Sequence, residues 1–76
     1  MTCLELAKQE AEKFHAQGIE CRIAYGRRNR RDKNLHAWVI VNGWLDDPTF
    51  KVMVPLDNVD PLEYEEEPRW QLEMFL

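Results

Sequence analysis

The dipeptide Asn42-Gly43 constrains the fold of this chain more than any other feature of its sequence. An Asn-Gly pair between two strand-like segments is the strongest short-range signal for a two-residue β-hairpin, because both residues tolerate the positive φ angles of that turn. Residues 35–41 precede the pair and are rich in β-branched and aromatic side chains, and a shorter segment follows it, from Trp44 to Asp46 or Asp47. The sequence therefore predicts two antiparallel strands joined by a tight turn.

A helix is predicted ahead of this hairpin, from about residue 3 to residue 17. Apolar side chains recur there at steps of three and four, which places them on one helical face: Leu4, Ala7, Ala11 and Phe14. Thr2 is a favourable N-cap residue, since its hydroxyl oxygen can accept a hydrogen bond from the free N–H groups of the first turn. Gly18 readily takes the left-handed conformation that commonly follows the last helical residue.

Two further strands complete the predicted sheet. Residues 20–25 alternate polar and apolar side chains and stop at Gly26. Residues 50–54 form another short apolar segment, which Pro55 stops because proline has no N–H to donate to a strand ladder. We therefore expect an α+β fold in which one N-terminal helix packs on an antiparallel β-meander.

The C-terminal part of the chain gives weaker predictions. Prolines interrupt residues 55–68, and the run Glu65-Glu66-Glu67 is typical of a solvated surface. The last eight residues fit either an edge strand or a short helix. A chain of 76 residues has room for one domain, so we expect residues 1–76 to form a single domain in which residues 55–76 are an acidic extension.

The net charge of −4 is unevenly distributed along the chain. Residues 1–44 carry eight basic and five acidic side chains, whereas residues 45–76 carry two basic and nine acidic ones, so the two parts have charges of +3 and −7. The simpler interpretation is that the two parts attract each other or keep the protein in solution, and the alternative is a surface for a charged partner. The basic stretch from Arg27 to Lys33 lacks interleaved aromatic residues and any nucleic-acid motif, so nucleic acid is not the expected partner.

Neither a membrane segment nor a secretion signal is predicted. The longest apolar run, Ala37 to Val41, is far too short to cross a bilayer, and the first residues do not combine basic charge with an apolar stretch. We therefore expect a cytoplasmic protein. Its two cysteines, Cys3 and Cys21, are too few for a disulfide scaffold, and their spacing with the two histidines predicts neither a metal site nor another cofactor. The sequence does not specify an oligomeric state.

Three residues qualify as a site for thiol chemistry once these elements are placed. Cys3 opens the predicted helix, where free N–H groups and the positive end of the helix dipole stabilise a thiolate. In the expected hairpin register, His36 and Asp47 extend from the same face of the two strands, while Asp46 points to the other face. A thiol, an imidazole and a carboxylate that orients the imidazole together activate a cysteine for acyl transfer.

The order of these residues resembles the transglutaminase-like superfamily of cysteine enzymes. The resemblance rests on Cys3 at a helix start, on the stretches Gly18 to Arg22 and His36-Ala37-Trp38, and on Trp44 followed by Asp47-Pro48-Thr49. It covers residues 3–50 and implies a minimal papain-like fold. It also implies that Cys3 is the nucleophile, His36 the general base and Asp47 the residue that orients the imidazole. The implied reaction is acyl transfer at an amide bond of a protein or peptide, by a peptidase, deamidase or cross-linking enzyme.

Each of these residues also has a purely structural interpretation. Cys3 fits a small apolar residue on the inner helix face, His36 a hydrogen-bonded strand residue, and Asp47 a turn residue before a proline. The second hypothesis is therefore a noncatalytic interaction module, which keeps the fold and binds a protein partner through its charged surfaces. The relative reactivity of the two thiols distinguishes the two hypotheses, because only an enzyme requires an activated Cys3.

Overall fold

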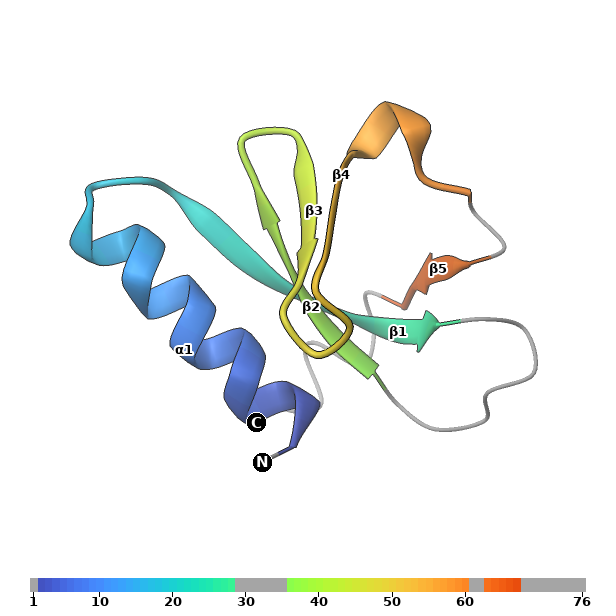
Figure 1. Cartoon of the computed structure of the whole chain (residues 1–76), viewed down its shortest axis with the longest axis horizontal. Coiled ribbons are helices and arrows are strands. Elements are labelled where there is room, and N and C mark those ends of the chain that lie inside the picture. Colours follow the sequence, from blue (N-terminus) through green and yellow to red (C-terminus); the bar gives the residue numbers. More distant parts are fainter. Residues whose placement is uncertain (1, 29–35, 61–62, 68–76) are drawn as a thin grey trace.

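The computed structural model describes residues 2–28, 36–60 and 63–67 of the chain (Figure 1). The helix is α1 (Cys3–Ala16), and the strands are β1 (Cys21–Arg28), β2 (His36–Val41), β3 (Trp44–Asp47), β4 (Val52–Pro55) and β5 (Tyr64–Glu66). A short 3-10 helix, η1 (Leu56–Asn58), lies between β4 and β5. The predicted α+β fold, with one N-terminal helix on an antiparallel meander, is confirmed.

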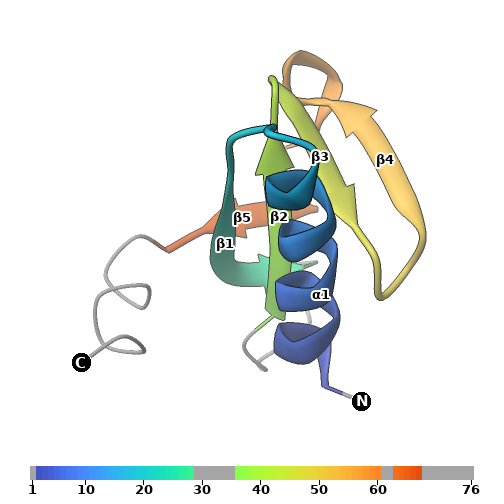
Figure 2. The ribbon, with the colours of Figure 1, turned by 90° about the vertical axis from the view of Figure 1, so that its left-hand side faces the viewer.

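Both ends of α1 follow the local signals that predicted them. The side-chain oxygen of Thr2 accepts a 3.2 Å hydrogen bond from the backbone N–H of Glu5, as an N-cap residue does. At the other end Gly18 takes a positive φ of 76°, and its N–H donates to the carbonyl oxygen of His15. The helix packs on one face of the sheet, against β1 and β2 (Figure 2).

The hairpin of β2 and β3 has the predicted register. The two residues of Asn42-Gly43 take positive φ angles of 49° and 78°, as a tight turn between right-twisted strands requires. Val39 faces Asp46 across the hairpin. Because successive side chains alternate between the two faces, Asp47 extends from the face opposite to that of Asp46, and His36 shares the face of Asp47. The turn therefore decides which of the two adjacent aspartates can reach the histidine.

The strand order is β4-β3-β2-β1-β5, and every neighbouring pair of strands is antiparallel. The first four strands form the predicted meander, whereas β5 pairs with the far edge of β1 and is a strand that the sequence pattern did not predict. Glu65 and Glu66 belong to β5, where Glu65 is exposed, as expected, and Glu66 is half-buried. The Glu66 carboxylate forms an ion pair with Arg22, so opposite charges from the two parts of the chain meet at this strand pair.

The strand β1 is longer than predicted, because Gly26 does not end it. The strand continues to Arg28, and Gly26 pairs with Glu66 of β5. A Cβ atom at position 26 would overlap the backbone carbonyl of Glu65, so a glycine is required for β5 to approach this closely. The strand β4 begins two residues later than predicted and includes Pro55, which an edge strand tolerates.

The two faces of the sheet carry separate apolar cores. The buried residues on the α1 face are Ala7, Tyr25, Ala37, Val39 and Val41. The buried residues of the opposite core are Ala24, Trp38, Leu45 and Tyr64. His36 belongs to this second face, because its ring stacks on that of Trp38 with 5.8 Å between the ring centroids. The buried histidine therefore lies on the side of the sheet that α1 does not cover.

Several predictions concern residues that the structure does not describe. The central part of the basic stretch and the strand or helix expected at residues 69–76 lie outside the described residues. The assignment of residues 1–76 to a single domain also stays a prediction. Within residues 2–28, 36–60 and 63–67, no helix is long and apolar enough to span a bilayer.

Candidate functional site

A buried pair of His36 and Asp47 lies at the open end of the β2–β3 hairpin. The Nε2 atom of His36 and the Oδ2 atom of Asp47 are 2.8 Å apart. Asp47 is 0% exposed and His36 is 6% exposed. His36 begins β2 and Asp47 ends β3, so the antiparallel hairpin brings them together at the end opposite its turn. The structure thus joins the two residues that the sequence suggested as base and orienting carboxylate.

Four hydrogen-bond donors hold the carboxylate of Asp47. Its Oδ1 atom accepts from the backbone N–H groups of Thr49 and Phe50, at 3.0 and 3.4 Å. Its Oδ2 atom accepts from His36 and from the hydroxyl of Tyr64, the latter at 2.7 Å. Burial alone would raise the pKa of Asp47, but the hydrogen bonds from His36 and Tyr64 outweigh it and hold that pKa below its usual value. Asp47 is therefore an ionised acceptor at neutral pH.

The imidazole of His36 is fixed in direction as well as in position. It stacks on Trp38 with an angle of 30° between the ring planes, and its centroid lies 5.4 Å from that of Phe50. Because ionised Asp47 can only accept hydrogen bonds, Nε2 carries the ring proton that points to it, and Nδ1 of the neutral ring keeps its lone pair. A neutral imidazole with one unprotonated nitrogen is the form that a general base requires.

Two further residues of the site, Arg28 and Tyr64, were not predicted from the sequence. The Nε–H of Arg28 donates a 3.1 Å hydrogen bond to the Tyr64 hydroxyl, and Nε lies 3.9 Å from Asp47 Oδ2. The guanidinium group also stacks 3.8 Å from the ring centroid of Phe50, which is a cation–π contact. The pairing of β1 with β5 sets Arg28 opposite Tyr64. No local motif marks either residue, because this pairing joins segments that are far apart in the sequence.

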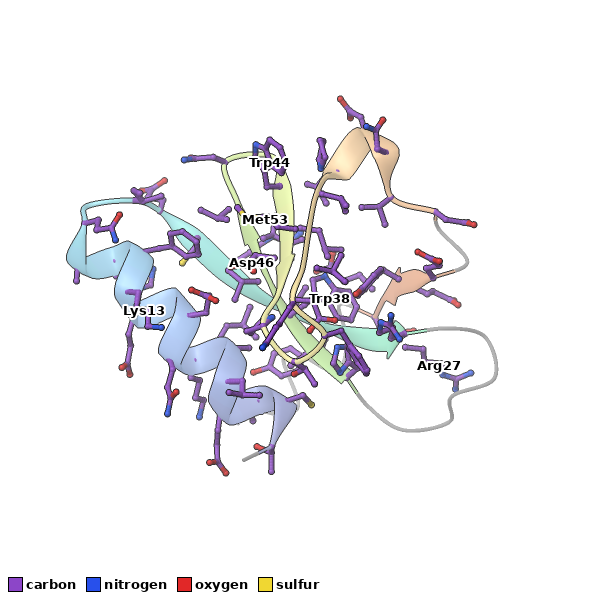
Figure 3. The ribbon with its side chains drawn as sticks, in the orientation of Figure 1. Lys13, Arg27, Trp38, Trp44, Asp46 and Met53 are labelled. Carbon is purple, nitrogen blue, oxygen red and sulfur yellow. The ribbon has the colours of Figure 1, made fainter. Side chains whose placement is uncertain are left out.

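Asp46 lies on the other face of the sheet, the face on which α1 packs (Figure 3). It is 8% exposed. Burial, the negative charges of Glu10 and Asp47 and a hydrogen bond with Glu10 raise the pKa of Asp46 to about 6, although the charge of Lys13 lowers it. Asp46 is thus a buried carboxyl group that ionises less readily than an exposed aspartate, and its side chain lies on the face opposite to that of His36.

We expect Asp46→Asn to stabilise the protein above pH 6, by roughly 1–3 kcal/mol in urea unfolding. The pKa of Asp46 is raised from 3.8 to about 6 in the folded chain. The ionised carboxylate therefore destabilises the folded state to its full extent above the folded-state pKa of about 6, and this destabilisation is absent below 3.8, where the carboxyl is protonated in both states. The advantage of the variant should therefore disappear as the pH falls toward 4. Asp57→Asn, at an exposed aspartate of η1, is the matched control and should show no such pH dependence.

Cys3 lies in the first turn of α1 and is half-buried against the core cluster that contains Tyr25 and Ala37. The helix α1 and the strand β2 start at the same end of the molecule (Figures 1 and 2), and Cys3 and His36 are their first residues. The ring of His36 packs on Trp38 of the opposite core, so Cys3 approaches this end from the α1 side. The structure therefore brings His36 and Asp47 into direct contact, whereas Cys3 packs on the α1 face of the sheet, opposite the face that carries the His36 ring.

The second cysteine forms a contrasting thiol–imidazole pair. The Sγ atom of Cys21 lies 3.4 Å from Nε2 of His15 and 3.6 Å from the carbonyl oxygen of Ala11. The pair borders a pocket of about 480 Å³ at the C-terminal end of α1. Burial raises the pKa of the Cys21 thiol, and the negative end of the helix dipole does not favour a thiolate there. Of the two cysteines, Cys3 therefore has the surroundings that better suit a nucleophile.

Metal ligation receives no support from the side chains that the structure describes. Among residues 2–28, 36–60 and 63–67, no group of three His, Cys, Asp or Glu side chains is arranged to hold a metal ion.

Comparison with known proteins does not assign the site, since no protein-family model, no curated protein and no solved structure matches this chain. The chemistry of the site must therefore be argued from its own residues.

Proposed function

We propose that this chain is a small cysteine enzyme of the transglutaminase-like type, which transfers the acyl group of a peptide or protein amide through a thioester on Cys3. The observation that supports this proposal most is the buried 2.8 Å hydrogen bond between His36 and Asp47. It orients an imidazole for proton transfer at the end of the sheet where α1 begins. In this proposal Cys3 is the nucleophile, His36 the general base and Asp47 the carboxylate that orients the imidazole.

The proposed reaction has two halves that share one base. The Cys3 thiol and the His36 ring extend from opposite faces of the sheet, so this step requires the thiol to reach the ring around the end where α1 and β2 begin. The Nδ1 atom of His36 then takes the proton of the Cys3 thiol, and the thiolate attacks the carbonyl carbon of the amide. The imidazolium then returns this proton to the nitrogen of the leaving amine as the C–N bond breaks, which leaves a thioester on Cys3. In the second half, His36 removes a proton from water or from an acceptor amine that attacks the thioester, and it returns the proton to the sulfur of Cys3 as the C–S bond breaks.

The position of Cys3 at the start of α1 supports its role in two ways. The positive end of the helix dipole stabilises the thiolate that attacks. In the proposed reaction, the oxyanion that forms on the substrate carbonyl also lies at this positive end of the dipole. Both contributions depend on the helix start, which the Thr2 cap fixes.

Alkylation with iodoacetamide tests the proposal without a known substrate. We expect Cys3 to react at neutral pH at least about tenfold faster than Cys21, because a helix N-terminus and an oriented imidazole favour its thiolate. His36→Ala should slow the alkylation of Cys3 by about tenfold or more. Peptide mass mapping of samples quenched at successive times measures the rates of both thiols in the same reaction.

The His15→Ala variant is the matched control, since it removes the imidazole beside Cys21 and leaves the pair of His36 and Asp47 intact. Its Cys3 rate should stay within about twofold of the original. Equally slow alkylation of both thiols, unchanged by His36→Ala, would contradict the proposal.

A noncatalytic interaction module is the second candidate, and one observation favours it. Trp44 and Met53 are 41% and 53% exposed and belong to the adjacent strands β3 and β4 (Figure 3). They extend from the same face as Asp46, where α1 packs mainly against β1 and β2. Large exposed apolar side chains on a sheet suit a protein partner. Slow alkylation of Cys3 that does not depend on His36 would favour this candidate.

A further inference from the structure

The side chains around Asp47 form a chain of hydrogen bonds with a defined direction. Arginine only donates, so the 3.1 Å contact of Arg28 Nε with the Tyr64 hydroxyl oxygen makes Tyr64 the acceptor there. The Tyr64 hydroxyl has a single proton, and it donates this proton to Asp47 Oδ2 at 2.7 Å. The same carboxylate oxygen accepts from His36. The order of donation is therefore Arg28 to Tyr64 to Asp47, with His36 donating from the other side.

We propose that Tyr64 is a positioning residue of the site, which fixes the Asp47 carboxylate so that it orients His36, and that Arg28 aims the Tyr64 hydroxyl. This inference rests on the proposed function, because it assigns Tyr64 a role in orienting the base for Cys3. Tyr64 touches no reacting atom in this account and acts only through Asp47.

The burial of the hydroxyl supports this role. Tyr64 is 8% exposed, and its ring meets that of Trp38 edge to face at 5.1 Å between centroids. Burial and the hydrogen bond to Asp47 raise the pKa of Tyr64 to about 12, although Arg28 lowers it, so the phenol keeps its proton through the neutral range. Tyr64 is thus a permanent donor, whereas a water molecule in its place would exchange and reorient.

The pairing of β5 with β1 is what delivers this donor to the site. Tyr64 pairs with Arg28, and Gly26 allows the close approach of the two backbones at Glu65. A second contact holds the same strand, since Glu66 forms an ion pair with Arg22 away from the carboxylate of Asp47. Because the two contacts are separate, the effect of the hydroxyl can be distinguished from the effect of holding β5 in place.

Tyr64→Phe tests the proposal, because the ring can keep its contact with Trp38 while the donor is lost. Two measurements on the full chain are needed: the pH titration of the Asp47 side-chain carbon by NMR, and the alkylation rate of Cys3. We expect the pKa of Asp47 to rise, because one of the hydrogen bonds that lower it is gone. We expect Cys3 to be alkylated about fivefold more slowly at neutral pH, since a less firmly held imidazole is a poorer base. Arg28→Met should change both quantities in the same direction.

Glu66→Gln is the matched control, because it weakens the other β5 contact without touching Asp47. It should leave the Asp47 titration unchanged and the Cys3 rate within about twofold. The proposal is overturned if Tyr64→Phe leaves the Asp47 titration unchanged, or if Glu66→Gln shifts it equally. If Tyr64→Phe does not fold, an unchanged Asp47 titration in Arg28→Met overturns the proposal. The carboxyl titration does not involve Cys3, so it can support the positioning role even where the alkylation test contradicts the proposed function.

Discussion

Replacing Asp47 with alanine is expected to destabilise the folded protein by about 3–5 kcal/mol at neutral pH. Asp47 is fully buried and accepts hydrogen bonds from two side chains and two backbone N–H groups. Alanine leaves all four donors without this acceptor, in a place that water does not readily reach. A domain of this length has a total stability of roughly 4–11 kcal/mol, so this loss is between about a quarter of the total and all of it. Urea unfolding of the two proteins at pH 7 measures it.

The Asp47→Asn variant separates the charge of this side chain from its size. Asparagine keeps one oxygen acceptor, so we expect a smaller loss, of about 1–3 kcal/mol. The pKa of Asp47 is lower in the folded chain than its usual value of 3.8, so the stability that its charge contributes is complete above that value and is lost as the pH falls through the folded-state pKa. The difference between the original chain and Asp47→Asn should therefore narrow in acid below pH 4. Urea unfolding at several pH values measures this, and equal stability of all three proteins at pH 7 would contradict the arrangement described for the carboxylate.

The sequence correctly predicts the pair of His36 and Asp47, because a local turn signal determines how their two strands align. The positive φ angles at Asn42-Gly43 allow a single tight register, and this register puts His36 and Asp47 on one face and Asp46 on the other. The cap at Thr2 similarly fixes where α1 begins, and hence that Cys3 lies in its first turn. Short-range chemistry of this kind can be read without knowing the rest of the fold.

The residues that the sequence did not predict depend on contacts between distant segments. A glycine after an alternating segment is typical of a strand end, yet Gly26 lies within β1, because the backbone of β5 crosses close to it. The prolines that interrupt residues 55–68 predict no strand there, yet residues 64–66 form β5, on which Glu65 is exposed as its charge predicts. Without this strand pair, no pattern connects Arg28 with Asp47. The pairing of β5 with β1 therefore overrides local propensity, and the same pairing brings Arg28 and Tyr64 to the carboxylate of Asp47.

The second large effect that we expect concerns covalent chemistry on Cys3. An activated ester such as p-nitrophenyl acetate carries a good leaving group, so it can acylate an activated thiol without the specificity that a natural substrate requires. We expect a stoichiometric burst of nitrophenolate followed by slow turnover, because hydrolysis of the thioester is the slower step. Cys3→Ala should abolish this burst, and His36→Ala should slow it by about a hundredfold. Cys21→Ala should leave both its amplitude and its rate unchanged.

Peptide mass mapping of the protein quenched after this burst locates the acyl group, and it shows directly whether His36 and Asp47 activate Cys3. We expect a thioester on Cys3, absent from Cys21 and formed at a rate that depends on His36. Acylation of Cys21 alone, or acylation of Cys3 at the same rate in the His36→Ala variant, would contradict the proposal that His36 and Asp47 activate Cys3.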